Sequence, residues 1–540
     1  MRAFLLGLLI TLPLAAQGMV VSQDRLASEA GASILRKGGN AVDAAVATAF
    51  ALAVTHPAAG NLGGGGFLVL REPNGETTTF DFRERAPRAA RPDMFLREGR
   101  PQDDLRHEGA VSAGVPGSVA GLHLAWRRRG RLSWKGLLEP AIKLAERGFQ
   151  VSPTLARSLA AEWPRLGRHP GSRAQFGRGG RPLPEGDRLV QRDLGRSLRR
   201  IAASGPRGFY EGPTAQALLA EMRRGGGLIT APDLQDYRAV ERLALKGAYR
   251  GWEIVAMGPP SSGGQVLIEG LNVLEGFELA ALPEPTRIHL MAETLRRAFL
   301  DRARHLGDPE ANPDLPLARL TDKAYATDLR KGIDLAKASH SDPSQAQAPE
   351  EPQHTTHLSA VDREGRAVAL TTTLEDSYGS GVLVRGAGFL LNNEMGDFNA
   401  APGLTDATGL IGTAANQARP GARMLSSMCP VILVKDGVLL TLGSPGGRTI
   451  PSTVLGLAVG VVDLGLDPQA AVDAPRFHHQ WLPDRIQAEP GVPVEALRAL
   501  GHFVKPVARQ GVAHVIRFRN GRAEGGADAK RWGDSAAVAE

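Results

Sequence analysis

Cysteine is almost absent from this chain of 540 residues, and its absence excludes two ways of holding a fold together. The single cysteine, Cys429, allows no intramolecular disulfide and no cysteine-rich metal site. It stands in the apolar stretch Met428–Ile432, where we expect a buried, structural thiol. The chain must therefore rely on a hydrophobic core, for which its length is ample.

Long hydrophobic runs are also missing beyond the first residues. The apolar run from Phe4 to Ala16 follows Arg2 and is too short to span a bilayer. Small residues come before Met19, so the run is typical of a secretory signal cleaved between Ala15 and Met19. We therefore expect residues 1–18 to be a signal peptide and the mature protein to be soluble, without a membrane segment, and periplasmic or secreted.

Lysine is scarce: only ten of the 64 basic residues are lysines, and arginines spread along the chain contribute most of the positive charge behind a net +7. No nucleic-acid-binding motif accompanies them, so we expect a solvated surface and no nucleic acid partner.

The glycine run Gly60–Gly66 is not followed by Gly-Lys-Ser/Thr, which favours a tight turn over a phosphate loop. Adjacent His478 and His479 would point to opposite faces of a strand, and no ligand cluster accompanies them. We expect no metal and no cofactor.

The residue pattern changes at about position 355. Helical patterns dominate residues 116–340, whereas strand patterns dominate after Thr355. We expect one helix from Ser22 or Gln23 to Gly38, and others at 41–54, 117–128, 137–147, 214–223, 286–304 and 452–464. Expected strands are 67–70, 77–82, 355–361, 366–373, 428–434 and 438–442. Together these elements suggest two antiparallel sheets layered between helices, with no linker between separate domains.

A polar, Pro- and Gln-rich stretch, Ser339–Gln353, leads directly into His354 and Thr355. A self-cleaving precursor needs such an accessible bond followed by a hydroxyl nucleophile. Cleavage before Thr355 would free its α-amine, whose usual pKa of about 8 suits a general base for the threonine's own hydroxyl. An ordinary strand that begins with threonine is the alternative, and these residues alone favour that alternative.

The turn predicted at Asp362–Gly365 sets what lies opposite Thr355. If Asp362 pairs with Arg366 across a three-residue loop, Thr355 lies opposite Thr373, whereas a four-residue loop would place it opposite Thr372. Either arrangement puts a second hydroxyl about 5 Å from the Cβ of Thr355, close enough to orient it.

Taken in order along the chain, the motifs closely resemble those of the γ-glutamyltranspeptidase family, a branch of the N-terminal nucleophile hydrolases. The resemblance runs from about Gly18 to the C-terminus, and as a set its motifs are highly specific. They are Ala47–Phe67, Asp81-Phe82-Arg83-Glu84, Thr355-Thr356-His357, Leu391–Phe398, Leu425–Met428, Gly443–Gly447 and Ala474–His479. The resemblance implies an α+β fold, a four-layer αββα sandwich of two stacked, mainly antiparallel sheets. It also reverses the balance between the two interpretations of Thr355.

The resemblance further implies an inactive precursor that cleaves itself between His354 and Thr355. Residues 19–354 would form a large subunit and residues 355–540 a small, catalytic subunit, both within one αββα unit. Thr355 would be the nucleophile for self-cleavage and for substrate attack, and Thr373 would hydrogen-bond near its amine or hydroxyl. The amides of Gly446 and Gly447 would converge on the developing oxyanion.

A γ-glutamyl donor, such as glutathione, carries an α-carboxylate and an α-ammonium remote from its scissile amide. The resemblance implies that Arg83 binds the carboxylate as a planar fork, with further donors from Ser426 and Ser427. Glu394 and Asp397 would pair with the ammonium. The expected activity passes the γ-glutamyl group to water or to an amino acid or peptide acceptor.

Two positions depart from the family pattern. Glu375 stands where asparagine is common, and strand alternation from Thr373 directs it toward the donor ammonium. Three carboxylates would then share one cation, so one of them could stay protonated. Thr408 replaces an aromatic gate residue in the lid-like stretch Pro402–Arg423. Some acylase-like relatives carry an acid at the position of Glu375, so a glutaryl- or cephalosporin-type acylase remains an alternative. A non-catalytic γ-glutamyl-binding protein is a further alternative.

Overall fold

The computed structural model describes residues 18–345, 354–399, 401–403, 406–407 and 412–540. Residues 1–17 of the expected signal peptide and the gate position Thr408 lie outside the described residues. Within the described part of the chain, no helix combines the length and the apolar character needed to cross a membrane.

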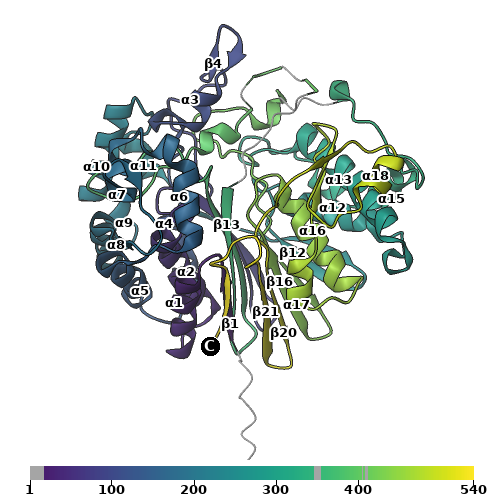
Figure 1. The fold of residues 1–540 in the computed structure, drawn as a ribbon, viewed down its shortest axis with the longest axis horizontal. Coiled ribbons are helices and arrows are strands. Elements are labelled where there is room, and N and C mark those ends of the chain that lie inside the picture. Colours follow the sequence, from purple (N-terminus) through teal and green to yellow (C-terminus); the bar gives the residue numbers. More distant parts are fainter. Residues whose placement is uncertain (1–17, 346–353, 400, 404–405, 408–411) are drawn as a thin grey trace, which may run out of the picture.

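Two antiparallel sheets lie face to face between two layers of helices (Figure 1). The first sheet has seven strands in the order β10-β3-β2-β14-β13-β1-β22, and the second has six in the order β11-β12-β15-β16-β20-β21. The first comprises β1 (Met19–Ser22), β2 (Gly65–Arg71), β3 (Thr77–Asp81), β10 (Val240–Arg242), β13 (His354–Val361), β14 (Ala367–Glu375) and β22 (Ala536–Ala539). The second comprises β11 (Leu245–Tyr249), β12 (Trp252–Ala256), β15 (Val431–Lys435), β16 (Val438–Gly443), β20 (His514–Arg519) and β21 (Arg522–Ala527). The predicted αββα sandwich is confirmed.

Each sheet carries its own helix layer on the outer face (Figure 1). The layer on the first sheet comprises α1 (Arg25–Arg36), α2 (Ala41–Thr55), α4 (Ser118–Arg129), α5 (Trp134–Arg147), α6 (Pro153–Leu166), α7 (Pro170–Phe176), α8 (Arg192–Ser204), α9 (Arg207–Tyr210), α10 (Gly212–Gly225) and α11 (Ala231–Asp236). The layer on the second comprises α12 (Gly263–Leu274), α13 (Glu284–His305), α16 (Thr449–Val462) and α17 (Pro468–Asp473).

Shorter elements surround this frame. The helices are α3 (Asp103–His107), α14 (Leu317–Leu320), α15 (Lys323–Lys331) and α18 (Val494–Ala499). The paired strands are β4 (Leu96–Arg97) with β5 (Arg100–Pro101), β6 (Phe149–Gln150) with β9 (Arg188–Leu189), and β7 (Gly177–Arg178) with β8 (Arg181–Pro182). A small third sheet joins β17 (Phe477–His478), β18 (Ile486–Ala488) and β19 (Val504–Pro506).

Alternating side chains explain how the first sheet can be buried on both faces. In β2, Leu68 and Leu70 belong to the core shared with α1 and α2. Phe67 and Val69 belong to the core shared with the second sheet. All four side chains are fully buried. A strand buried on both faces reads as an unbroken apolar run, which is the pattern that Phe67–Leu70 shows.

Helix α2 is buried along its whole length, as its almost entirely apolar sequence predicts. Asn40 and Asp43 cap it reciprocally: the Asn40 side chain accepts the Asp43 amide at 3.0 Å, and the Asp43 side chain accepts the Asn40 amide at 3.1 Å. The Asp362 carboxylate, in the turn between β13 and β14, accepts the Ala41 amide at 3.0 Å. The start of α2 is therefore tied to the turn of the hairpin that carries Thr355.

The hairpin of β13 and β14 has the three-residue loop that places Thr355 opposite Thr373. The Asp362 amide donates to the Arg366 carbonyl at 3.1 Å and closes the loop. The alternative pairing with Thr372 is wrong. The register shifts between His354 and Thr355, so the strand is irregular at the bond where cleavage is expected.

Both sheets contain strands from before and from after this bond. β13 and β14 lie between β1 and β2, and β12 pairs with β15. Neither sheet can therefore be assembled from one side of the bond alone.

Several short strands differ from the expectation. β10, β11 and β12 lie within the stretch expected to be mostly helical, and β1 ends at Ser22, where a helix was expected to begin. Helix α1 starts instead at Arg25, because Asp24 accepts the Ala27 amide at 3.0 Å as its N-cap. Residues 19–22 are held in a strand by pairing with both β13 and β22.

Candidate active site

One cavity at the open end of the β13–β14 hairpin gathers most of the residues that the sequence singled out. Its empty space, counted together with open solvent at its mouth, is about 260 Å³. It is lined by Arg83, Thr355, Thr373, Glu375, Asp397, Ser426, Ser427, Met428, Gly447 and Ile450. Glu394 is not part of this lining, although it pairs with Arg83, and Gly446 precedes Gly447 in the same turn. Segments more than 300 residues apart thus converge on Thr355.

Thr355 and Thr373 occupy facing positions on the two strands, and both are buried. The Thr373 hydroxyl accepts the Glu375 amide at 2.8 Å and also hydrogen-bonds Glu394. Thr373 therefore connects the strand opposite the nucleophile to one of the acids assigned to the donor ammonium.

The Arg83 guanidinium is buried and held from several sides. It forms ion pairs with Glu394 and Asp397, and its Nε donates to the Met424 carbonyl at 3.2 Å. Although burial alone would lower it, these two carboxylates hold the pKa of Arg83 above its usual range. The sequence assigned Arg83 and the two acids to opposite charges of a donor, and the structure shows that they also pair with each other.

Burial raises the pKa of Glu394 to about 8, against the opposing effect of Arg83. Burial also raises the pKa of the neighbouring Glu84 to about 8. The Oε2 of Glu84 lies 3.6 Å from Arg83 Nη1. Several buried carboxylates thus share one guanidinium, and burial favours a proton on some of them.

Glu375 is the clearest example of such a carboxyl. Burial, followed by the charges of Asp397, Asp376 and Glu394, raises the pKa of Glu375 well above its usual range. Its backbone has φ of 77°, which breaks the regular strand alternation, yet its side chain still reaches the cavity. The expectation that Glu375 belongs to the acid cluster therefore agrees with its position.

His107, which the sequence did not single out, faces this cluster. Its Nδ1 lies 3.4 Å from Glu375 Oε1 and 3.5 Å from Asp376 Oδ2. Burial, together with Arg106, lowers the pKa of His107 to about 4, so its imidazole is neutral at pH 7. His107 lies in the short helix α3, more than 200 residues before the acids, and no local pattern marks it.

Buried polar groups of the helix layer on the second sheet hold Ser426 and Ser427 in place. Ser427 accepts a hydrogen bond from Arg302 at 3.0 Å, and the carbonyl of Ser426 accepts from the Ser262 hydroxyl at 2.7 Å. Arg302 also donates to Ser262 at 2.8 Å. Arg302 and Ser262 were not predicted either, because only the fold brings α12 and α13 to this point.

Gly446 and Gly447 lie at the start of α16. Their carbonyls accept the amides of Thr449 and Ile450, each at 3.1 Å, and so begin the helix. Gly446 has φ of 133°, and a methyl group there would collide with the Thr449 hydroxyl. Glycine is therefore required at this turn, and the helix N-terminus favours negative charge beside it.

Asn416 links the lid-like stretch to the donor acids. Its side-chain amide donates to the Asp397 carbonyl at 2.7 Å and accepts the Leu425 amide at 2.9 Å. The described end of this stretch thus positions Asp397 next to the serine pair.

The two adjacent histidines have separate partners within the described residues. His478 bonds Ser452 at 2.7 Å and Gln480 at 2.8 Å, whereas His479 bonds Asp484 at 3.2 Å. Elsewhere in the described chain, His289, Glu293 and His502 lie close enough to hold a metal. His289 and His502 hydrogen-bond each other at 2.7 Å, and Glu293 pairs with Arg296 and Arg297. Each of these three groups therefore already has a protein partner.

Comparison with known proteins gives consistent matches along the chain. A family model for gamma-glutamyltranspeptidase matches residues 27–538. The glutathione hydrolase proenzyme of Escherichia coli (strain K12) is 46% identical over 494 residues, covering 90% of this chain and 85% of that protein. The acylase ACY 1 proenzyme of Pseudomonas sp. (strain V22) is 39% identical over 502 residues, covering 90% and 87%. The structure of a cephalosporin acylase from Bacillus halodurans matches with a TM-score of 0.86 at 28% identity, covering 100% of this chain and 99% of that one.

Proposed function

The chain belongs to the γ-glutamyltranspeptidase family, and on that premise we propose that Thr355 is the nucleophile of a self-processed glutathione hydrolase and γ-glutamyltransferase. The enzyme takes the γ-glutamyl group from glutathione or another γ-glutamyl amide. It passes the group to water or to the amine of an amino acid or peptide.

The observation that carries this proposal is the composition of the cavity. It combines a buried threonine at the head of a strand, a guanidinium, three acids within reach, two serines and a glycine turn at a helix N-terminus. Such a set suits a substrate with a carbonyl to attack and a zwitterionic α-carbon to bind.

Maturation begins at the irregular end of β13. The Thr355 hydroxyl attacks the carbonyl carbon of His354, and the C–N bond breaks to leave an ester and a free α-amine on Thr355. Water then hydrolyses the ester, which releases the His354 carboxylate. The register shift between these two residues supports this step, because an irregular strand end leaves the carbonyl less constrained than a regular ladder would.

In the first half of turnover, the α-amine of Thr355 takes the proton of its own hydroxyl as the oxygen attacks the donor's γ-carbonyl. The Gly446 and Gly447 amides stabilise the oxyanion of the tetrahedral intermediate. The intermediate collapses, the proton passes to the departing amine, and a γ-glutamyl ester of Thr355 remains. Water or an acceptor amine attacks this ester and frees Thr355.

Donor recognition follows from the ion pairs around Arg83. The donor's carboxylate can take the place of Glu394 or Asp397 on the guanidinium, and its ammonium can then pair with the displaced acid. One internal ion pair becomes two pairs with the substrate, so the charges stay balanced. Ser426 and Ser427 add donors for the carboxylate.

The division of the chain into a signal peptide and two subunits, and the location of the enzyme, are part of the same proposal. Residues 1–18 form a signal peptide, residues 19–354 a large subunit and residues 355–540 a small subunit. The location is periplasmic or secreted. Sequencing the N-termini of both bands after denaturing electrophoresis of purified protein tests each boundary directly.

We expect Thr355→Ala to remain a single chain without activity, because it lacks the attacking hydroxyl. Thr355→Ser keeps the hydroxyl and is the matched control, which should still mature, more slowly. Electrophoresis and hydrolysis of a γ-glutamyl anilide measure both effects. A Thr355→Ala protein that is still cleaved before residue 355 would contradict the assignment of Thr355 as the nucleophile.

An acylase acting on glutaryl or cephalosporin amides is the second candidate, and the likeness to a cephalosporin acylase structure favours it. Its glutaryl donors lack the α-ammonium. Side-by-side kinetics with γ-glutamyl and glutaryl anilides separates the two functions, since the acid cluster favours the donor that brings a cation. A non-catalytic γ-glutamyl-binding protein, the third alternative, would stay uncleaved or would bind the donor without turnover.

A further inference from the structure

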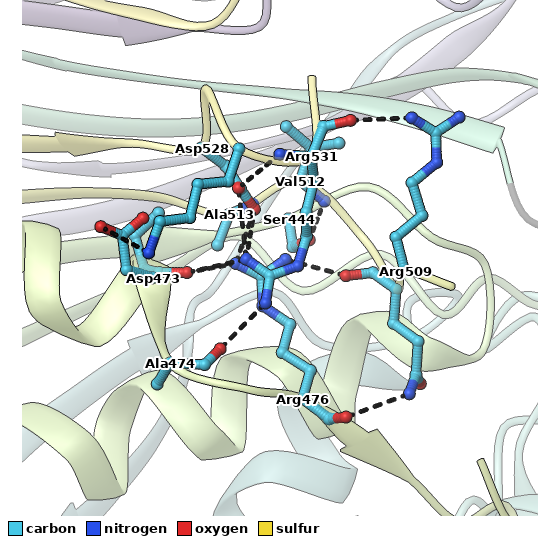
Figure 2. Close-up of polar contacts among 12 residues, drawn as sticks. Ser444, Asp473, Ala474, Arg476, Arg509, Val512, Ala513, Asp528 and Arg531 are labelled. Carbon is cyan, nitrogen blue, oxygen red and sulfur yellow. Dashed lines mark hydrogen bonds and ion pairs between the residues drawn. The ribbon is translucent and has the colours of Figure 1, made fainter. Parts of the chain in front are cut away.

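The motif Ala474–His479 lies outside the lining of the cavity, yet it contains a buried arginine, Arg476, at the centre of an ion-pair network (Figure 2). Arg476 Nη2 pairs with Asp528 Oδ2 at 2.7 Å, and Arg531 Nη1 approaches Asp528 Oδ1 at 3.3 Å. Arg531 Nε donates to Glu489 Oε1 at 2.7 Å, and Glu489 Oε2 accepts the Arg476 amide at 3.1 Å. Two cations and two anions thus close one buried network, the Arg476 network, in which their charges balance.

The Arg476 network holds a single loop, residues 509–513, from several sides (Figure 2). Arg476 Nη1 donates to the Gln510 carbonyl at 2.8 Å, and the Gln510 amide donates to Glu489 Oε1 at 2.5 Å. The Ala513 amide donates to Asp528 Oδ2 at 3.1 Å. Charged hydrogen bonds of this kind are among the stronger ones in a protein, so the backbone of the loop is firmly placed.

The same loop packs directly against the turn that carries Gly446 and Gly447. The Val512 amide donates to Ser444 Oγ at 3.1 Å, and Ser444 Oγ donates to the Pro445 carbonyl at 2.7 Å. A methyl group on Gly511 would lie 2.6 Å from Ser444 Oγ and 2.9 Å from the Pro445 carbonyl oxygen. No space separates loop and turn, so a shift in the loop must shift the turn.

We propose that Arg476 and Asp528 are positioning residues that fix the oxyanion-binding turn through the 509–513 loop. This inference rests on the proposed function and deepens it. The network touches neither the nucleophile nor the donor clamp in the described structure; its contribution is to keep the amides of the turn where negative charge develops. Stabilisation of an oxyanion depends steeply on the placement of its donors, so a small displacement slows the chemical step without weakening substrate binding.

The test is Arg476→Lys, which keeps the charge but cannot hold Asp528, Gln510 and Val472 together as a guanidinium does. We expect kcat for a γ-glutamyl anilide to fall about ten- to a hundred-fold, below the roughly hundred- to thousand-fold loss typical of removing an oxyanion donor. KM should change by less than about twofold, because the donor clamp is intact.

A second measurement separates positioning from general weakening. A boronic acid with the γ-glutamyl chain forms a tetrahedral adduct on the nucleophile, whereas free glutamate only occupies the donor site. Arg476→Lys should lose affinity for the boronic acid in step with kcat and keep its affinity for glutamate. Equal losses for both ligands, or an unchanged kcat, would overturn the inference.

Arg366→Lys is the matched control. Arg366 is half-buried and pairs with Glu72 at 2.6 Å and Asp362 at 3.1 Å, at the opposite end of the β13–β14 hairpin. The Arg366→Lys substitution should lower the melting temperature and leave kcat unchanged. An equal fall in kcat for the control would also overturn the inference.

Ser444→Ala tests the same link with little risk to folding, since it removes one hydroxyl between loop and turn. We expect a several-fold fall in kcat with KM unchanged, and it decides the matter if Arg476→Lys does not mature. Failure of the proposed function looks different: the native enzyme itself would then not hydrolyse γ-glutamyl anilides.

Discussion

A guanidinium fixed between two carboxylates, as Arg83 is between Glu394 and Asp397, is suited to bind a zwitterion. Arg83→Lys keeps the positive charge but loses the planar fork. A charged hydrogen bond contributes roughly 1.5–3 kcal/mol, so donor affinity should fall about ten- to a hundred-fold. The Michaelis constant for a γ-glutamyl anilide measures this loss.

Self-cleavage provides the internal control for Arg83, because it involves no free substrate carboxylate. The Arg83→Lys precursor should still split into two chains. An unchanged Michaelis constant would place the carboxylate clamp at another residue.

Glu375 adds a carboxyl whose pKa is raised well above its usual range by burial and by its acidic neighbours, which favours its protonated form. A donor ammonium favours its ionised form, whereas a glutaryl donor leaves the cluster without a cation. We expect Glu375→Gln to narrow the preference for γ-glutamyl over glutaryl anilides, mainly by weakening the former. The ratio of the kcat/KM values for the two anilides measures this preference.

Asp376→Asn is the control for Glu375, because Asp376 faces the same His107 but bonds Asn393 at 2.7 Å. It should leave the donor ratio nearly unchanged. If Glu375→Gln lowers only the melting temperature and keeps the donor ratio, Glu375 serves the fold and not the substrate.

Among the elements, the cap of α1 has an unusual electrostatic position. Burial raises the pKa of Asp24 from an ordinary 3.8 to about 6, despite the hydrogen bonds that its carboxylate accepts. The folded state therefore favours the protonated acid, and the stability it contributes is present below about pH 4 and lost as pH rises to about 6.

Asp24→Asn should therefore stabilise the protein at neutral pH. Asparagine caps a helix about as well as aspartate and cannot ionise, and a pKa rise of this size corresponds to roughly 3 kcal/mol. The gain in melting temperature over the native enzyme should grow from pH 4 to 6 and then stay constant. A gain that does not depend on pH would contradict this explanation.

Elements with a long apolar pattern could be predicted, and short ones could not. Helix α2 was expected because its cap and its apolar run lie side by side in the sequence. β10 and β11 were missed because their residues are mostly half-buried or exposed and follow no apolar alternation. Their strand conformation depends on the neighbouring strands, which no local pattern records.

The same limit applies to the active site. Thr355, Arg83 and the glycine turn lie in motifs specific enough to be found in the sequence, and the facing position of Thr373 followed from a turn. His107 and Arg302 come from helices far from those motifs, so only the folded chain shows that they contact the acids and Ser427.

At the scale of the whole molecule, each sheet is built from strands that precede and strands that follow the bond after residue 354. We therefore expect the two chains to remain together after cleavage, because separating them would expose the core of each sheet. Gel filtration in native buffer should show one species, and denaturing electrophoresis of the same fraction should show two. Separation of the chains without denaturant would contradict this expectation.

The place of β22 beside β1 also sets a schedule for synthesis (Figure 1). β13 has β1 on one side, and β1 pairs on its other side with β22, which follows Thr355 by about 180 residues. The sheet that presents Thr355 is therefore incomplete until β22 has been made. We expect a nascent chain that already contains the cleavable bond to wait for β22 before it is processed.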